Sequence, residues 1–363
     1  MKAAVMYGVG QPLVIEDLDI QEPQAGEVLV KTSASGVCHS DLHFMEGSWM
    51  FPTPVVLGHE SAGVVEKVGA GVTNVKPGDR VVIAFVASCG TCDRCITGRP
   101  VLCTNASPMG RVGRISKGGT PVFQFAGMGA FGAQQLVDAK ACVKVPDGVP
   151  MEVACLVGCS VMTGVGAVRN AAGVKVGDSV AVIGCGGVGV QVVSAASLAG
   201  AARVIAIDRD PAKLELAHSH GATDVLLAGD DVVRDVHALT DGGTDHAIEV
   251  VGRPETIRQA FAMIREGGTA VVVGIAPRGV DVAIPALDFI SDKTLRGCFY
   301  GSGNVLGEMP SVVSMVASGR LRVSDVVSDV IGLDGIEDAF QRLRDGRGAR
   351  SLVVLDSEAA GGP

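Results

Sequence analysis

Residues 180–189 read VAVIGCGGVG, an apolar strand-like run followed by a glycine-rich turn that leads into a helix-like segment. The next strand-like run ends at Asp208, 19 residues beyond Gly189. A strand, the pattern G-x-G-x-x-G, a helix and an acidic residue after the following strand together predict a Rossmann-type dinucleotide site. The glycines let a pyrophosphate approach the backbone, and the helix N-terminus offers it unpaired N–H groups. The residues predicted to cradle it are Gly184, Gly186, Gly187, Val188 and Gly189.

Asp208 decides which dinucleotide is expected. Its carboxylate can accept hydrogen bonds from an adenosine ribose and would repel a 2′-phosphate, so the sequence favours NAD over NADP. Arg209 is also assigned to the cofactor site, and as a cation beside Asp208 it argues weakly in the other direction. The alternative is a glycine turn that binds nothing, and the complete strand, turn and helix context argues against it.

The pattern around this motif predicts an α/β protein of two domains, and 363 residues are enough for each domain to bury its own core. From 161 to 299, strand-like and helix-like runs alternate, which predicts a doubly wound parallel sheet. One helix should open at Asp210-Pro211, an acceptor N-cap followed by proline at the first helical position. Residues 1–160 are instead rich in short β-branched runs between glycine and proline turns. Residues 300–363 hold two helical stretches and a last strand.

Composition and charge limit the function classes. Hydrophobic residues make up 47% and charged residues 19% of the chain, a globular composition without the features of disorder. The formal net charge of −9 argues against a general nucleic-acid or anionic-membrane partner. The start of the chain lacks the apolar core and cleavage site of a secretory signal, so we expect a cytoplasmic protein. The run 180–202 is uncharged, but its glycines fit a strand, turn and helix better than a membrane span.

Four cysteines within 15 residues form the sharpest metal-binding pattern: Cys89, Cys92, Cys95 and Cys103. In a chain without an export signal, grouped cysteines favour metal thiolates over disulfides. Four thiolates fill the tetrahedral shell of one zinc ion and leave no open position, so the site is expected to be structural. An iron–sulfur cluster is the rival, but the bacterial run continues with x3-C-P, which is absent here. A nucleic-acid zinc module would need two C-x2-C pairs about 12 to 20 residues apart, which the chain also lacks.

A second group of ligand-type residues occupies residues 36–43, GVCHSDLH, and residues 58–60, GHE. The sequence suggests that Cys38 and His59 share a metal. Ser40 and His43 would then move a proton away from whatever the metal activates. Spacing alone does not identify a further ligand.

These motifs together resemble the zinc-dependent medium-chain alcohol dehydrogenases over almost the whole chain. The resemblance rests on GVCHSD, GHE, the four-cysteine segment, a Gly-Cys pair at 158–159 and the glycine fingerprint. It implies a GroES-like, β-rich catalytic domain over 1–160, completed by 300–363, and a Rossmann NAD-binding domain over 161–299.

The resemblance also assigns the residues of the catalytic zinc. Cys159 becomes the third ligand beside Cys38 and His59, although Cys155 is equally plausible on local grounds. The fourth position is left for water or substrate, as a catalytic zinc requires. Glu60 matches the glutamate next to the zinc, and Asp41 matches the carboxylate that orients the histidine ligand.

Further positions are assigned by the same resemblance. Ser40 and His43 match a hydroxyl-to-histidine proton relay that runs through the cofactor ribose. His39 falls where the family places a basic residue against the pyrophosphate. Trp49, Phe85 and Ile275 fall at positions of the substrate pocket, and ordinary core packing is an equally good interpretation of them. The cofactor site is also assigned Thr163 and, for a second time, Ile275. Lys213 is expected near the adenosine ribose and Arg350 at the pyrophosphate, although a solvated surface charge is an equally good interpretation of both.

The expected activity is zinc-dependent hydride transfer between a primary or secondary alcohol and NAD, with one catalytic and one structural zinc per chain. One alternative keeps the zinc chemistry but acts on a thiol adduct, as thiol-cofactor-dependent formaldehyde dehydrogenases do. An alternative of another class is a non-catalytic nucleotide-binding zinc protein. The segment Asn105 to Met128 resembles the longer loop of dimeric family members, so we expect a homodimer rather than a tetramer.

Overall fold

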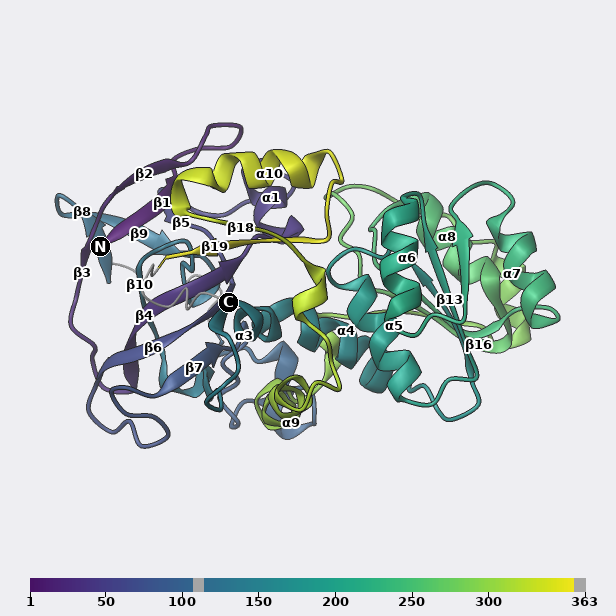
Figure 1. Cartoon of the computed structure of the whole chain (residues 1–363), viewed down its shortest axis with the longest axis horizontal. Helices are drawn as coiled ribbons and strands as arrows, with labels where there is room; N and C mark the ends of the chain where they lie inside the picture. Colours follow the sequence, from purple (N-terminus) through teal and green to yellow (C-terminus); the bar gives the residue numbers. More distant parts are fainter. Residues whose placement is uncertain (107–113, 356–363) are drawn as a thin grey trace. The chain divides into compact units, whose positions relative to one another are not determined.

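The computed structural model describes residues 1–106 and 114–355 of the 363-residue chain. The chain divides into two compact units (Figure 1). One, the discontinuous unit, comprises Met1–Cys159 and Asn304–Pro363; the other, the inserted unit, comprises Ser160–Gly303. The sequence placed the two junctions at 160/161 and 299/300, within four residues of these positions.

The inserted unit is built on a six-stranded sheet in the order β14-β13-β12-β15-β16-β17, and every neighbouring pair is parallel. The chain moves outward from β12 in one direction and then restarts at β15 on its other side, so the carboxyl ends of β12 and β15 form a topological switch point. The strands are β12 (Ser179–Ile183), β13 (Arg203–Asp208), β14 (Asp224–Leu227), β15 (Thr244–Glu249), β16 (Ile264–Val272) and β17 (Thr294–Gly297).

Helices cover both faces of this sheet, as a doubly wound fold requires (Figure 1). Asp210 caps α6 by accepting a hydrogen bond from Ala212 N at 3.0 Å, and Pro211 occupies the first helical position. The expected start of this helix is therefore confirmed. The sheet's core includes Ile183, Ile205 and Phe261. The helices are α5 (Gly189–Leu198), α6 (Pro211–Ser219), α7 (Val232–Thr240) and α8 (Pro254–Met263).

The discontinuous unit contains two sheets. The first runs β2-β1-β5-β9-β8-β3 and the second runs β11-β7-β6-β4-β19-β18, with β10 also paired to β4. The strands of the first sheet are β1 (Lys2–Met6), β2 (Val14–Asp17), β3 (Asp19–Ile20), β5 (Val55–Val56), β8 (Ile115–Lys117) and β9 (Thr120–Gln124). Those of the second are β4 (Glu27–Gly36), β6 (Glu60–Val68), β7 (Arg80–Ile83), β10 (Gln134–Asp138), β11 (Cys142–Lys144), β18 (Val327–Ile331) and β19 (Arg350–Val354).

The end of the chain completes the second sheet. Strand β19 pairs antiparallel with β4, and Leu352 lies opposite Gly36. In Figure 1 the yellow C-terminal strands lie beside the purple N-terminal ones. Phe340 packs against Phe131 with ring centroids 6.0 Å apart, so the two segments also share a core. The helices of this unit are α1 (His39–Met45), α2 (Asp93–Ile96), α3 (Met151–Leu156), α9 (Val305–Ala317) and α10 (Ile336–Arg344).

One helical run among the described residues, Met151–Ala172, is long and apolar enough to cross a membrane by length and composition. About four fifths of its most apolar window, 78%, is buried inside the protein, as expected of a core helix. The run is not uniformly α-helical, because Val157–Val161 and Ala167–Ala172 form wider π-helical turns. Residues 180–202, the other apolar run, form β12, a turn and α5.

Candidate active site

Two adjacent strands bring the first ligand-type residues together. Strand β4 ends at Gly36 and β6 begins at Glu60, and these two residues lie opposite each other in the antiparallel ladder. Cys38 then adopts an extended conformation (φ −117°, ψ 151°) as the N-cap residue of α1. His59 directly precedes β6. Strand pairing therefore brings together Cys38 and His59, which are 21 positions apart in the sequence.

Cys159 joins this group from the π-helical turn Val157–Val161. The ligand atoms of Cys38, His59, Glu60 and Cys159 all lie within 4.8 Å of one another. Two thiols, an imidazole and a carboxyl group form a donor set suited to zinc. Cys155 takes another role, since its thiol contacts Glu152 O at 3.1 Å.

The electrostatics of the cluster favour a metal-binding state of Cys38. A hydrogen bond from Cys159 is the main cause that holds the pKa of Cys38 well below its usual value, and His59 and Arg350 act in the same direction against burial. The same hydrogen bond holds the pKa of Cys159 well above its usual value. Cys38 is therefore set up as a thiolate, the form that binds metals.

Asp41 orients the imidazole of His59. Its Oδ1 accepts a hydrogen bond from Gly58 N at 3.0 Å and lies 3.1 Å from His59 Nδ1. Burial acts to lower the pKa of His59, but Asp41 and Cys38 outweigh it and raise the pKa well above 6.5. With Nδ1 held by Asp41, Nε2 is the nitrogen available as a metal ligand.

Glu60 and Arg350 form a buried ion pair beside the cluster. Arg350 Nη1 lies 3.6 Å from Glu60 Oε1 and donates a 2.9 Å hydrogen bond to Val37 O. Both Glu60 oxygens are buried without a hydrogen-bond partner among the described residues. Burial raises the pKa of Glu60 to about 7, although Arg350 opposes this. A carboxylate that is buried and only partly compensated fits a further cation, such as a metal ion, next to it.

The Glu60 carboxylate occupies the position that a side chain at Gly36 would fill. A Cβ atom at this position would stand 2.1 Å from Glu60 Oε2 and 3.0 Å from the Leu156 side chain. The last residue of β4 must therefore lack a side chain.

The expected proton-relay residues lie on α1. Ser40 Oγ is 3.8 Å from Cys38 Sγ, and His43 follows one turn later on the same helix. Both side chains are partly exposed, whereas His39 is exposed. Burial is the main influence on His43 and lowers its pKa, although Cys38 and Glu46 oppose it. His43 is therefore neutral near pH 7 and able to accept a proton.

Aromatic rings surround the imidazole ligand. The rings of Phe85 and Phe125 approach His59 edge-on, with centroid distances of 5.4 and 5.5 Å. Phe125 also packs against Phe44, with ring centroids 4.5 Å apart, and Phe44 packs against Trp49, with ring centroids 5.3 Å apart. Phe85 and Trp49, two of the three residues expected at the substrate pocket, are both partly exposed.

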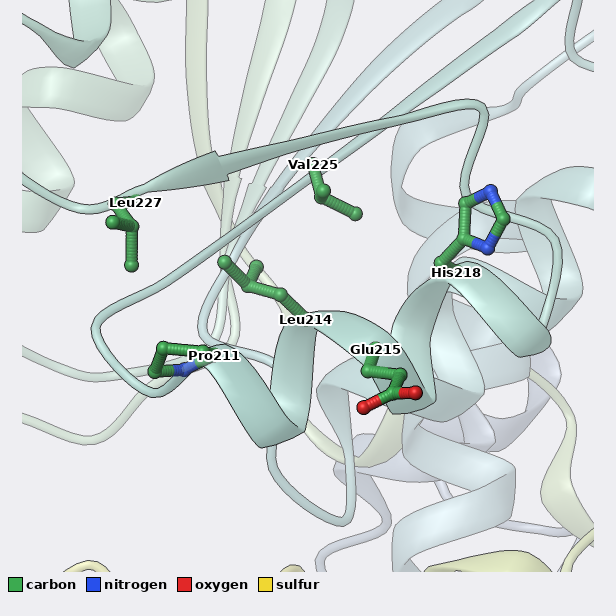
Figure 2. Close-up of a pocket in the computed structure, with 6 residues that line it drawn as sticks. All are labelled: Pro211, Leu214, Glu215, His218, Val225 and Leu227. Carbon is green, nitrogen blue, oxygen red and sulfur yellow. The ribbon is translucent and has the colours of Figure 1, made fainter.

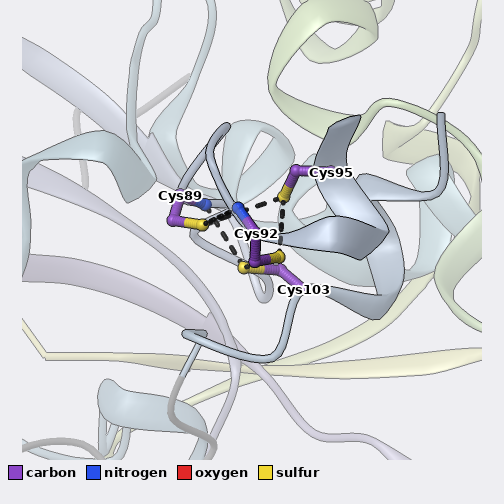
Figure 3. Close-up of side chains that lie close together, drawn as sticks. All are labelled: Cys89, Cys92, Cys95 and Cys103. Carbon is purple, nitrogen blue, oxygen red and sulfur yellow. Dashed lines mark hydrogen bonds between the residues drawn. The ribbon is translucent and has the colours of Figure 1, made fainter. Parts of the chain in front are cut away.

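The four-cysteine segment forms a separate cluster (Figure 3). Cys92 Sγ lies 3.5 Å from Cys95 Sγ and 3.8 Å from Cys103 Sγ, and Cys89 Sγ lies 4.0 Å from Cys95 Sγ. Thiolates about 2.3 Å from a tetrahedral zinc would be roughly 3.8 Å apart, whereas a disulfide needs about 2 Å. All four cysteines are free thiols. The geometry thus fits one zinc ion.

Hydrogen bonds prepare the cluster for metal. The hydroxyl and backbone N–H of Thr91, together with Cys92 N, donate to Cys89 Sγ and lower the pKa of Cys89 to about 5. Asn105 Nδ2 also donates to Cys89 Sγ at 3.3 Å. Such donors stabilise a metal-bound thiolate.

The glycine-rich turn of the inserted unit has the geometry of a phosphate cradle. Gly184 has φ +92°, and a Cβ on Gly189 would stand 1.8 Å from Gly184 O, so both positions require glycine. A Cβ on Gly186 would meet nothing within 4 Å, so the backbone there is open to a ligand. Gly187 and Val188 complete the turn, with Val188 as the N-cap residue of α5.

Asp208 lies at the end of β13 beside this turn. Its Oδ2 accepts a hydrogen bond from Cys185 N at 2.7 Å, and its Oδ1 accepts one from Asp210 N at 3.0 Å. The backbone therefore fixes the carboxylate beside the glycine turn. Arg209 is exposed, Lys213 and Ile275 are partly buried, and Thr163 is buried in α4 (Met162–Gly166).

A shallow hollow of about 330 Å³ lies elsewhere on the inserted unit, between α6 and the edge strand β14 (Figure 2). The residues that line it include none of the predicted site residues: Pro211, Leu214, Glu215, His218, Val225 and Leu227. The lining is mostly apolar and has no cluster of ligand-type groups, so we assign no chemistry to it.

Comparison with known proteins identifies the family. Residues 24–147 match the alcohol dehydrogenase GroES-like domain, and residues 187–318 match the zinc-binding dehydrogenase domain. An NDMA-dependent alcohol dehydrogenase of Amycolatopsis methanolica is 38% identical over 98% of this chain and 99% of its own. The chain belongs to the zinc-dependent medium-chain alcohol dehydrogenases. The expected family is therefore confirmed, as is the expected combination of GroES-like and Rossmann folds.

Other alcohol dehydrogenase relatives differ in their named substrates. An S-(hydroxymethyl)glutathione dehydrogenase of Photobacterium damsela subsp. piscicida is 37% identical over 97% of this chain and 99% of its own. The crystal structure of benzyl alcohol dehydrogenase from Acinetobacter calcoaceticus superposes with a TM-score of 0.92 at 32% identity, covering 98% and 99% of the two chains. This alcohol dehydrogenase is thus a zinc-dependent oxidoreductase that uses a nicotinamide cofactor and acts on small alcohols or aldehydes.

The sequence missed one part of the alcohol dehydrogenase site. Arg350 was expected at the pyrophosphate, a contact that remains a prediction, but its partners within the discontinuous unit are Glu60 and Val37. No signal near residue 350 points to residues 37 or 60, because the association depends on β19 pairing with β4.

Proposed function

We propose that the protein is an NAD-dependent alcohol dehydrogenase in which Cys38, His59 and Cys159 hold a catalytic zinc. The observation that carries this proposal is the buried cluster of these residues with Glu60, whose ligand atoms lie within 4.8 Å of one another. Three protein ligands leave one zinc position for substrate, and Glu60 supplies compensating negative charge beside it.

The reaction removes a hydride and a proton from the alcohol and leaves an aldehyde or ketone. When bound, zinc would polarise the alcohol oxygen and NAD would accept the hydride. Two side chains of the protein transfer the proton from the alcohol to solvent. Ser40, beside Cys38 on α1, takes it from the hydroxyl group, and the neutral imidazole of His43 passes it to solvent.

NAD is proposed over NADP because of the charge on Asp208. Its carboxylate is fixed beside the glycine turn by Cys185 N and Asp210 N. A carboxylate at this position suits ribose hydroxyls and repels a 2′-phosphate. The second zinc would be held by Cys89, Cys92, Cys95 and Cys103 and would have a structural role, because four thiolates leave no open position.

The substrates we propose are primary alcohols with an aromatic ring next to the carbinol carbon. The chain has one Trp, two Tyr and ten Phe, yet several of these few rings gather around His59. A substrate ring can stack edge-to-face against Phe85 or Trp49, which a saturated ring cannot do as well. The structural relative named benzyl alcohol dehydrogenase supports the same class.

One experiment tests the reaction and its substrate class together. NADH formation is followed with benzyl alcohol and with cyclohexylmethanol, which has similar size without aromaticity. We expect kcat/KM to favour benzyl alcohol by about tenfold, as one or two aromatic contacts would supply. Phe85→Leu should reduce this ratio severalfold. Phe123→Leu is the matched control, because the Phe123 ring packs against Phe51, with ring centroids 6.4 Å apart.

The outcomes separate the parts of the proposal. A ratio near one in the wild type would reject the aromatic class but not the dehydrogenase. Absence of NADH formation with every alcohol, in protein that carries zinc, would reject the dehydrogenase itself. Faster reduction of NADP than of NAD would reject the Asp208 argument.

A second candidate is oxidation of a thiol adduct of formaldehyde, favoured by the relatives named S-(hydroxymethyl)glutathione dehydrogenase. Formaldehyde turnover that appears only after glutathione is added would establish it. The alternative of a non-catalytic zinc protein predicts about one zinc per chain, whereas the enzyme predicts about two.

We also propose a cytoplasmic homodimer. The dimer rests on the segment Asn105 to Met128, of which residues 107–113 lie outside the described part. A mass near twice the 36.9 kDa chain in light scattering would support it, and a mass near four times the chain would contradict it.

A further inference from the structure

Glu249 is a fully buried carboxylate at the topological switch point of the inserted unit. It is the last residue of β15 and lies opposite Ile183, the last residue of β12, in the parallel register. Ile183 directly precedes the glycine turn. In open parallel sheets, ligands bind outside the carboxyl ends of the strands at such a switch point.

The carboxylate organises the loop that follows β15. Its Oε1 accepts hydrogen bonds from Val251 N at 2.9 Å, Gly252 N at 2.7 Å and Thr256 Oγ1 at 2.7 Å. A single oxygen thus holds two consecutive backbone amides of the loop and the first turn of α8. Burying a carboxylate is costly, and three donors to one oxygen offset that cost.

This loop contacts the loops that follow β12 and β16. A Cβ on Gly184, the first glycine of the fingerprint, would stand 2.7 Å from Val251 Cγ2. Gly252 has φ +86°, and a Cβ there would stand 2.5 Å from Ile275 O. The backbone of Glu249 also holds the third loop, because its carbonyl accepts hydrogen bonds from Val273 N at 2.8 Å and Gly274 N at 3.1 Å.

We propose that Glu249 is a positioning residue for the nicotinamide dinucleotide, because it fixes the loops after β12, β15 and β16 against one another. The proposal rests on the proposed NAD-dependent function. Glu249 does not need to contact the cofactor. Its role is to hold Val251 against Gly184 and Gly252 against Ile275.

The test compares two substitutions of this residue. Glu249→Ala leaves three donors without an acceptor, so the loop relaxes, and the Kd for NADH should rise by about tenfold or more. Glu249→Gln keeps an oxygen acceptor of the same shape, so the Kd should stay within about threefold of the wild type. NADH binding is measured by isothermal titration, independently of turnover. At saturating NAD, kcat should change by less than about threefold in both variants, because the reacting groups are untouched.

Two further variants serve as a control and as a second test in case Glu249→Ala does not fold. Glu266→Ala removes an exposed carboxylate of the same unit and should leave the Kd unchanged. Gly252→Ala leaves Glu249 intact but forces the loop away from Ile275, so it should weaken NADH binding as Glu249→Ala does. If Glu249→Ala does not fold, the comparison of Gly252→Ala with wild type decides.

The result that overturns the proposal is a wild type that binds NADH while folded Glu249→Ala and Gly252→Ala bind it equally well. A fall in thermal stability with unchanged Kd would give Glu249 a purely structural role. A wild type that does not bind NADH would instead reject the proposed function.

Discussion

At the scale of single residues, the pair of Glu60 and Arg350 determines how the metal site behaves without its metal. Both side chains are buried, and Arg350 Nη1 lies 3.6 Å from Glu60 Oε1. Removing one partner of a buried ion pair lowers the free energy of unfolding strongly, because the other charge stays buried without compensation. Replacing both partners by apolar residues has a much smaller effect.

Replacing Arg350 should therefore destabilise the metal-free protein strongly. We expect Arg350→Leu to lower the free energy of unfolding by about 3–5 kcal/mol in chelator, and by less in zinc-loaded protein, where a bound cation compensates Glu60. Urea unfolding under the two conditions measures the difference. Arg347→Leu is the control, since its exposed pair with Asp345 should contribute at most about 1 kcal/mol. Equal losses with and without zinc would contradict the compensation.

His43 should set the acidic limb of the pH profile. Burial lowers its pKa below the ordinary 6.5, so the imidazole is neutral at pH 7 and becomes protonated only at lower pH. A protonated imidazole cannot accept a proton, so kcat should fall as the pH drops through this pKa. In His43→Gln we expect the limb to disappear and kcat at pH 7 to fall by about tenfold or more. His218→Gln, on the inserted unit, should leave both unchanged, and a limb that survives in His43→Gln would refute the relay.

Spacing and the family resemblance supplied the predicted site residues at this scale, but spacing alone could not choose between Cys155 and Cys159. Residues four apart on an α-helix lie on one face, so helical spacing treats the two alike. The structure separates them because Cys155 lies in α3 whereas Cys159 lies in a π-helical turn. Such turns are not visible in single-sequence patterns and are frequent at functional sites.

At the scale of elements, the four-cysteine segment has little buried apolar surface, because Val101 and Cys103 are its buried hydrophobic residues. It contains the one-turn helix α2, whose residues are all at least partly exposed, and a short 3-10 turn at Pro100–Leu102. With so little core of its own, the segment depends on its metal for order.

A segment that lacks one of its four thiolates should therefore no longer retain its zinc ion. We expect Cys95→Ser to lower the zinc content by about one ion per chain and to reduce the thermal midpoint by several degrees. Metal analysis and calorimetry measure the two effects. Cys298→Ser, a cysteine outside both clusters, should retain all the zinc. Unchanged zinc in Cys95→Ser would show that the segment binds no structural ion.

Local signals predicted the elements of the inserted unit well. The strand, turn and helix at residues 180–198 and the start of α6 at Asp210-Pro211 both depend on neighbouring residues. The pairing of β19 with β4 depends on residues more than 300 positions apart, so no local pattern could predict it. The contact of Arg350 with Glu60 was missed for the same reason.

At the scale of the whole molecule, each unit has its own core and its own predicted ligand. The core around Phe131 and Phe340 belongs to the discontinuous unit, and the core around Ile183 and Phe261 belongs to the inserted unit. Ligands that bind only the folded state stabilise the part that binds them.

Metal removal and cofactor binding should therefore affect different segments. In hydrogen-exchange mass spectrometry, we expect chelation to accelerate exchange at residues 36–45 and 89–103 and to leave β13 unchanged. NADH should slow exchange around residues 183–190 and 249–256 and leave residues 89–103 unchanged. Accelerated exchange across both units after chelation would show that their stabilities are not independent.

The pairing of β19 with β4 also has a consequence for synthesis on the ribosome. The inserted unit ends at Gly303, so its chain is complete before Arg350 and β19 have been synthesised. The discontinuous unit must wait for Arg350 and β19, although its strand β4 precedes the inserted unit in the chain. Since domains generally fold as units, we expect the dinucleotide site to form first and the catalytic zinc site only after β19 has been synthesised. A transcript truncated before β19 would thus yield a product whose inserted unit can fold. Its Cys38 would lack a folded zinc site and would remain a free thiol.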